Sequence, residues 1–195
     1  MNAKYLASLL TVLYFSIANV MAQQQPAAKS SFFATVRDHK QIYNSSCIPS
    51  SVEMVLKYNK KESSSFYKFQ NEWKEKTDGT FGDFNGKTID GITFTQQFNQ
   101  PRGIAFPFDS LYRTISKELK AGRKVIISLV SGPGMWHIWI VDHQTADGNF
   151  VGYSRGYQNN TVLEVTNIKG LVQAMQGTDI MTYKIAGKAA VKKAG

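Results

Sequence analysis

The stretch Asn44–Tyr58, NSSCIPSSVEMVLKY, indicates where the fold of this 195-residue chain is organised. Its apolar residues recur at the spacing of one helical face between Val52 and Leu56. Pro49 is compatible with a first helical turn, because the N–H that proline lacks has no intrahelical partner there. The stretch therefore predicts an amphipathic helix that begins at or just after Cys47.

Cys47 is the single cysteine of the chain, so no disulfide can form within it. The positive end of a helix dipole favours the thiolate form of a cysteine at the helix N-terminus, and a neighbouring histidine strengthens this effect. Thiolate is the nucleophilic form of cysteine. The position of Cys47 therefore predicts a catalytic nucleophile, whereas the ordinary interpretation of a lone cysteine is a small buried hydrophobe.

Three histidines are available as a partner for this thiol: His39, His137 and His143. His137 lies in GPGMWHIWIVD, directly after a Gly-Pro-Gly loop and at the start of a predicted strand, where a side chain can reach an open cleft. We predict that His137 is the base and that the other two histidines lie at the surface. Its neighbours Trp136 and Trp139 are expected in the core, with a position along the cleft as the alternative for Trp136.

The sequence pattern changes from helical to strand-like along the chain. Helices are expected over residues 63–77 and 108–122, the second capped by Asp109 or Ser110 and ended by Gly122, with loops over residues 78–107. The later segments predict, in order, a buried strand over 124–130, a hairpin of 135–142 with 149–154 across an Asp-Gly turn, a strand over 161–165, a short helix over 167–175 and a strand over 179–186. Because helices precede strands, the predicted fold class is α+β.

The N-terminal segment is typical of a cleaved secretory signal. Residues 1–22 combine Lys4, an apolar run and a small residue, Ala22, at the expected cleavage site. Polar residues interrupt the run, which is shorter than the ~20 apolar residues that a membrane span prefers. We therefore expect a secreted or periplasmic protein without a stable membrane span, with a linker over 23–37 and a basic tail over 187–195.

Composition and charge restrict the class of partner. The chain is 43% hydrophobic and 12% aromatic, as expected of a globular domain, and the residues after the signal suit one domain. Its net charge of +9 favours anionic surfaces such as those of the cell envelope. The charges are scattered and accompany no nucleic-acid motif, so no nucleic-acid partner is expected.

Gln41, six residues before Cys47, and the sequence Cys47-x-Pro49 followed by a helix resemble the start of papain-like cysteine peptidases. The similarity is greatest to the branch of bacteriocin-processing, double-glycine-leader peptidases and their secreted stand-alone relatives. The later segments ELKAGRKVIISLV, HIWIVD, DGN and FVGYSRG follow the order of that family. The resemblance implies a papain-like domain over residues 38–186, with N-terminal helices packed on a C-terminal antiparallel sheet and the nucleophile at the start of the central helix.

The resemblance also implies an activity and a set of roles. A protein of this family hydrolyses peptide bonds, with Cys47 as the nucleophile, His137 as general base and acid, and Gln41 as a donor in the oxyanion hole. No cofactor and no metal are implied. We accordingly expect a monomer that acts on a peptide or protein substrate. The cell envelope is one place where such a substrate would be found.

The sequence departs from the family pattern at two positions. Ile48 stands where the family usually has glycine after the nucleophile. The residue that orients the histidine is usually Asp or Asn, and here the position falls on Ser154 to within one residue, with Asn159 and Asp142 as alternatives. Asp142 lies five residues after His137, so it is expected to face the other side of the strand. These departures leave a second interpretation open, a catalytically silent papain-like domain that binds peptides or a partner.

Overall fold

The computed structural model describes residues 30–132 and 135–186, so the predicted signal peptide and basic tail lie outside the described part. None of the helices in that part is long and apolar enough to span a bilayer. The helical elements are α2 (Ser31–Asp38), α3 (Cys47–Tyr58), α4 (Lys68–Trp73), the 3-10 helix η1 (Phe81–Asp83), α5 (Phe108–Lys120) and α6 (Ile168–Ala174). The strands are β1 (Thr88–Ile89), β2 (Ile92–Gln97), β3 (Val125–Gly132), β4 (Met135–Gln144), β5 (Phe150–Arg155), β6 (Val162–Val165) and β7 (Ile180–Ile185).

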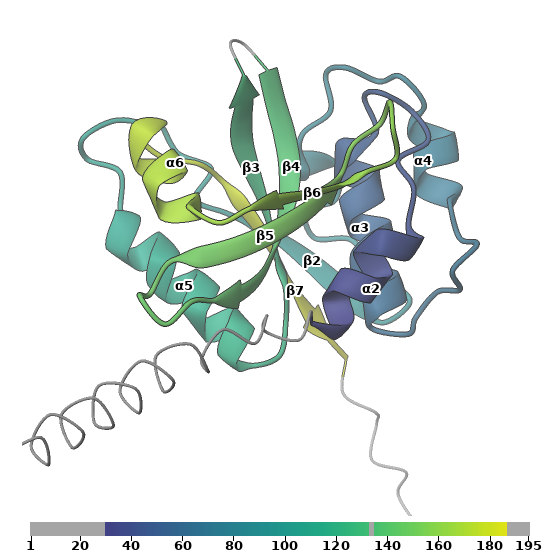
Figure 1. Cartoon of the computed structure of the whole chain (residues 1–195), viewed down its shortest axis with the longest axis horizontal. Coiled ribbons are helices and arrows are strands. Elements are labelled where there is room, and N and C mark those ends of the chain that lie inside the picture. The colour runs from purple at the N-terminus through teal and green to yellow at the C-terminus, as the bar shows by residue number, and fades with distance from the viewer. Residues whose placement is uncertain (1–29, 133–134, 187–195) are drawn as a thin grey trace, which may run out of the picture.

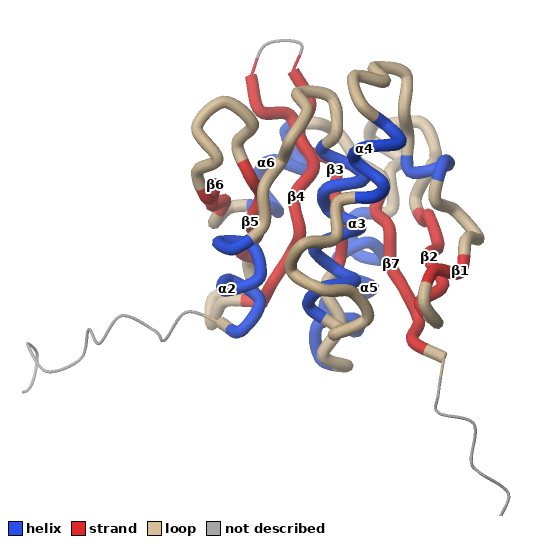
Figure 2. The backbone as a smooth tube through the Cα atoms, turned by 90° about the vertical axis from the view of Figure 1, so that its right-hand side faces the viewer, coloured by secondary structure: helices blue, strands red, loops and turns tan. Residues whose placement is uncertain are grey.

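All seven of these strands form one antiparallel sheet in the order β1-β2-β7-β3-β4-β5-β6, which Figure 2 shows from right to left. Helices α2, α3 and α4 lie on one side of the sheet in Figure 1, and α5 and α6 lie on the other. The mixture of helices with an antiparallel sheet confirms the α+β class.

Strand β3 lies between the two helical layers, because its sequence VIISLVSG is apolar at successive positions rather than at alternate ones. Ile126 belongs to the core on the α3 side, whereas Val125, Ile127 and Leu129 belong to the core against α5 and α6. The prediction of a strand buried on both faces is therefore confirmed. The hairpin of β4 and β5 also forms where it was predicted, with Gly148 in its turn at a φ of 82°.

Two segments that the sequence interpretation left without regular structure are ordered. Within residues 78–107, strand β2 pairs along its whole length with β7 and buries Ile92 and Phe94. Helix α2 lies in the predicted linker, where Phe32 and Val36 are fully buried in the core. The loop prediction for residues 78–107 was wrong, because the alternation in ITFTQQ is that of a half-buried strand.

The boundaries of two helices differ from the prediction. Helix α4 is much shorter than residues 63–77, because the chain turns away at Lys74, where φ is 52°. The indole Nε1 of Trp73 then donates to the carbonyls of Ser45 and Lys76, at 3.0 Å each. The next loop packs so closely on this indole that a Cβ added at Gly79 would lie 1.8 Å from the ring. As a result, residues 74–80 return to the start of α3.

Helix α5 begins at Phe108 with Pro107 in the N-cap position, so the predicted caps Asp109 and Ser110 lie inside its first turn. Its end agrees with the prediction, because Gly122 follows with a φ of 75°.

Candidate active site

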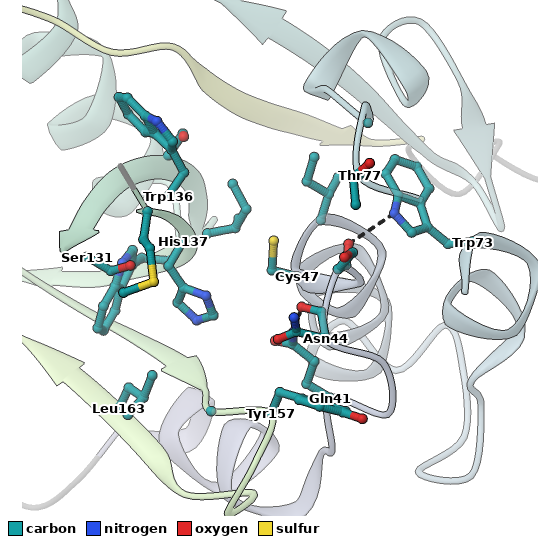
Figure 3. Close-up of a pocket in the computed structure, with 18 of the residues that line it drawn as sticks. Gln41, Asn44, Cys47, Trp73, Thr77, Ser131, Trp136, His137, Tyr157 and Leu163 are labelled. Carbon is teal, nitrogen blue, oxygen red and sulfur yellow. Dashed lines mark hydrogen bonds between the residues drawn. The ribbon is translucent and has the colours of Figure 1, made fainter. Parts of the chain in front are cut away.

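A pocket of about 810 Å³ opens where the N-terminus of α3 faces strand β4. Figure 3 shows Gln41 and Cys47 on one wall of this pocket and Trp136 and His137 on the facing wall. The fold therefore brings Cys47, His137 and Gln41 into one pocket from segments far apart in the sequence. Its further lining residues are Asn44, Ser45, Ile48, Trp73, Lys76, Thr77, Gly79, Thr80, Phe81, Ser128, Ser131, Met135, Ile138, Trp139, Gly156, Tyr157, Gln158, Asn159, Thr161, Leu163 and Asp179.

Cys47 is the first residue of α3, and its thiol lies in the pocket wall. Burial raises the pKa of the thiol, although the backbone groups of Ile48, Ile138 and Cys47 itself act in the opposite direction. Ile138 directly follows His137, so the sulfur lies beside the part of β4 that carries the histidine. The expectation of a thiolate is therefore wrong for the unliganded site, where the raised pKa keeps Cys47 protonated at neutral pH.

The ring of His137 is fixed by Ser154, which lies on the neighbouring strand β5. Its Nε2 lies 2.7 Å from Ser154 Oγ, and the same hydroxyl donates to the carbonyl of Ile138 at 2.7 Å. A carbonyl can only accept, and serine has a single hydroxyl hydrogen, so Nε2 must be the donor to Ser154. The neutral ring therefore carries its proton on Nε2, and Nδ1 is the basic nitrogen.

His137 is neutral in the unliganded protein. Burial lowers its pKa to about 4, against a smaller effect of the backbone of Arg155, which favours the charged ring. The edge of the His137 ring meets Trp139 with the ring centroids 5.5 Å apart. Trp136 lines the pocket and is 44% exposed, so it takes the alternative position along the cleft and not the expected core position. Trp139 packs against the core as expected and also lines the pocket.

Of the three alternatives for the residue that orients the histidine, Ser154 contacts the ring. Asp142 lies on β4 itself, is buried, and pairs instead with Lys124 Nζ at 2.5 Å and with His143 Nδ1 at 3.0 Å. Asn159 lines the pocket, but within the described part of the chain it makes no hydrogen bond to the imidazole. The described residues also provide no carboxylate that hydrogen-bonds to this ring.

Gln41 is buried, and its amide hydrogens are already used within its own loop. Its Nε2 donates to the carbonyls of Tyr43 at 3.1 Å and Asn44 at 2.9 Å. A substrate carbonyl in the pocket has to compete with these acceptors for the amide hydrogens. Ile48 packs into the core beside Cys47 and is 6% exposed, so the side chain that replaces the usual glycine is accommodated without filling the pocket.

Gln70 supports this loop, and the sequence interpretation missed it. Its Oε1 accepts from Ile42 N and from Ser46 Oγ, at 2.8 Å each, and its Nε2 donates to the carbonyl of Lys40 at 3.0 Å. These bonds hold the backbone on both sides of Gln41. They also hold Ser46, the residue that precedes Cys47.

His39 was predicted at the surface, and this was wrong: it is 1% exposed. Its ring contacts the hydroxyl of Ser50 at 3.1 Å and Lys57 Nζ at 2.9 Å. Glu53 accepts from the side chain of Gln70 at 2.8 Å, and burial raises the pKa of Glu53 to about 7. Burial also lowers the pKa of His39 well below its ordinary value, so its 3.7 Å approach to Glu53 is not an ion pair.

A signal for this buried cluster was present in the sequence. Ser50, Glu53 and Lys57 follow one another at positions i, i+3 and i+7, which is one stripe of α3. A polar stripe on a helix that is buried on most sides requires polar partners. Gln70 and His39 supply them.

The described residues contain no group of three or more His, Cys, Asp or Glu side chains that could hold a metal ion. No protein-family model matches the chain. No curated protein and no solved structure matches it either.

Proposed function

We propose that the protein is an exported cysteine peptidase or amidase of the papain-like type, which hydrolyses peptide bonds outside the cytoplasm. One observation carries the proposal. A single pocket contains the only thiol of the chain, at a helix N-terminus, and a histidine whose Nε2 is held by Ser154. The other nitrogen of this ring, Nδ1, is the one that would take the thiol proton.

In the first half of the proposed reaction, Nδ1 of His137 takes the proton of Cys47 as the sulfur attacks the carbonyl carbon of the substrate. A C–S bond forms, and the carbonyl oxygen becomes an oxyanion. The backbone N–H of Cys47 is one donor to it, and Gln41 becomes a second when it exchanges a loop carbonyl for the oxyanion. The imidazolium then protonates the leaving nitrogen as the C–N bond breaks.

In the second half, water attacks the thioester that remains on Cys47. His137 takes a proton from this water and returns one to the sulfur, so the acid product and the free thiol are released. Ser154 accepts from Nε2–H throughout, which keeps Nδ1 directed to the reacting groups. Because a serine hydroxyl is uncharged, it stabilises the imidazolium less than a carboxylate would.

The proposal is tested by labelling the full chain with a peptidyl vinyl sulfone at pH 7. Because Cys47 is the only cysteine, an intact-mass measurement assigns any single thiol adduct to it. We expect the native protein to react faster than the urea-denatured protein, and His137→Ala to remove this difference. A peptide-library digest should show cleavage that Cys47→Ala abolishes. Native labelling no faster than denatured labelling, together with an uncut library, contradicts the proposal.

The second candidate function is a catalytically silent papain-like domain that binds peptides or a partner. The raised pKa of Cys47 and the engaged amide of Gln41 favour it. The same experiment separates the two, because a silent domain retains peptides without cutting them.

Replacing Ser154 by alanine is expected to lower kcat/KM for a cleaved peptide by about 10- to 100-fold. The change leaves the buried Nε2–H of His137 without an acceptor, which costs about 1–3 kcal/mol, and each 1.4 kcal/mol corresponds to roughly a factor of ten. Ser65→Ala, at an exposed serine, is the control and should retain full activity. An unchanged rate in Ser154→Ala would assign the orienting role to another group.

A further inference from the structure

Asp179 lines the same pocket at a distance from the catalytic pair. It directly precedes β7, and its Oδ2 accepts from Gln96 Nε2 at 2.8 Å. The neighbouring Thr178 donates to the carbonyl of Ser128 at 2.5 Å, and Ser128 also lines the pocket. These bonds fix the carboxylate at the β7 end of the pocket, beside Ser128 in the middle of β3.

The pocket contains two charged side chains other than the proposed catalytic pair, and only one of them is neutralised. Lys76 is paired with Asp83 at 2.6 Å. Among the described residues, Asp179 has no cation within ion-pair distance. Burial raises its pKa, and the hydrogen bond from Gln96, the backbone of Asp179 itself and the charge of Arg102 oppose this only in part. That guanidinium lies over the ring of Trp136, 4.0 Å from the centroid, and forms no ion pair with Asp179, so the carboxylate is available to a cation from a ligand.

The sign of this charge is opposite to that of the whole protein. The chain carries a net charge of +9, which favours anionic ligands over most of its surface. Inside the pocket the uncompensated charge is negative. A general attraction for anions therefore does not explain the pocket, and its own chemistry selects a cation.

The sheet order gives the distance from this carboxylate to the reacting bond. The pocket extends across β7, β3, β4 and the β5–β6 loop, with His137 on β4 near the middle. Adjacent strands lie ~4.8 Å apart, so β7 is about 10 Å from β4. An extended peptide advances ~3.3 Å per residue. Asp179 therefore lies within about three residues of the scissile bond of a peptide that crosses the strands.

We propose that Asp179 forms a subsite for a cationic side chain, lysine or arginine, on one side of the scissile bond. The aromatic side chain of Phe81 and the hydroxyls of Thr80 and Ser128 line the same pocket and suit the methylene stem and the ammonium hydrogens of such a residue. Gln96 holds the carboxylate so that its other oxygen can receive the cation. The inference rests on the proposed peptidase function only in treating the bound peptide as a substrate that is cut. The subsite itself requires only that a peptide binds in the pocket.

The test uses the full chain and a positional library of decapeptides in which one position at a time holds lysine, norleucine or glutamate. Norleucine has nearly the same hydrocarbon chain as lysine without the ammonium group. We expect kcat/KM to favour lysine over norleucine by about 10-fold or more at one position within three residues of the cut. Asp179→Asn should bring this ratio close to one, and Asp179→Lys should shift the preference to glutamate. A ratio near one in the wild type, or an unchanged ratio in Asp179→Asn, overturns the proposal.

A matched control and a binding measurement separate this proposal from the peptidase itself. Asp109→Asn changes the net charge equally, but on α5 at the opposite face of the sheet, and should preserve the ratio. The immobilised Cys47→Ala chain should retain lysine peptides over norleucine peptides in an Asp179-dependent manner. If the library is not cut but this enrichment persists, the subsite stands and the peptidase proposal fails. The absence of enrichment overturns the subsite whether or not peptides are cut.

Discussion

Replacing His137 by alanine is expected to lower kcat/KM for a cleaved peptide by about 10³-fold, within the range of ~10² to 10⁴ that a general base contributes. The reason is the protonation state of the unliganded site. Burial raises the pKa of Cys47, so the thiol needs a base at the moment of attack. His137 is the neutral imidazole that lines the same pocket, with Nδ1 as its basic nitrogen.

The same two pKa shifts predict the pH dependence of the wild type. The proposed reaction requires neutral His137, whose pKa is lowered to about 4 by burial. Activity should therefore persist as the pH falls through 6.5, the ordinary value for histidine, and should be lost near pH 4. Alkylation of Cys47 by iodoacetamide, which requires the thiolate and no substrate, should be slow at pH 6 and should rise through alkaline pH.

His143→Ala is the control for these measurements, because His143 is exposed and its ring bonds to Asp142 outside the pocket. Circular dichroism across the pH range distinguishes loss of the base from acid unfolding. Rapid alkylation at pH 6 would show that the pair is ionised rather than neutral. An acid limb near 6.5 in a folded protein would show that burial does not lower the pKa of His137.

The parts of the fold that could be predicted are those whose signals are local. The helix that begins at Cys47 has its apolar stripe and its proline within one stretch, and the end of α5 depends on the single residue Gly122. The hairpin of β4 and β5 depends on a turn whose glycine adopts a φ of 82°. In each case the residues that determine the element lie within it or directly beside it.

The parts that were missed depend on partners far along the chain. Strand β2 alternates only over the six residues ITFTQQ, and its pairing with β7, which places Ile92 opposite Ile185, orders it. Helix α4 ends early because Trp73 bonds to a carbonyl near the start of α3. Such pairings carry no signal within a short window of sequence, because tertiary contacts override the local preference.

The candidate site divides in the same way. Cys47, His137 and Gln41 were predicted from the sequence and lie in one pocket. The position of the residue that orients His137 could be predicted to within one residue of Ser154. The protonation state could not be predicted, because burial changes a pKa as strongly as a charge does and is a property of the folded chain. The role of Gln70 could not be predicted from the sequence either, because its hydrogen bonds form only when α4 packs against the loop before α3.

Replacing Gln70 by alanine is expected to lower the free energy of unfolding by about 3–5 kcal/mol, a large part of the 5–15 kcal/mol typical of a domain. The change removes the partner of the N–H of Ile42, the carbonyl of Lys40 and one oxygen of Glu53, and each buried group left unsatisfied costs about 1–3 kcal/mol. The hydroxyl of Ser46 loses its bond to Gln70 but keeps the carbonyl of Tyr43 as an acceptor at 2.8 Å. Water that enters the cavity recovers part of the sum. Urea unfolding followed by circular dichroism measures the difference.

The same variant should lower the activity of the molecules that remain folded, because Gln70 holds the backbone on both sides of Gln41. We expect kcat/KM, normalised to the folded fraction, to fall by at least about 10-fold, with most of the change in kcat, since the oxyanion forms only in the reaction. Gln173→Ala, at an exposed position of α6, is the control and should change neither quantity. A loss of stability with normal activity per folded molecule would make Gln70 a structural residue only. A change of less than about 1 kcal/mol would mean that water or neighbouring groups replace the hydrogen bonds of Gln70, and it would contradict this prediction.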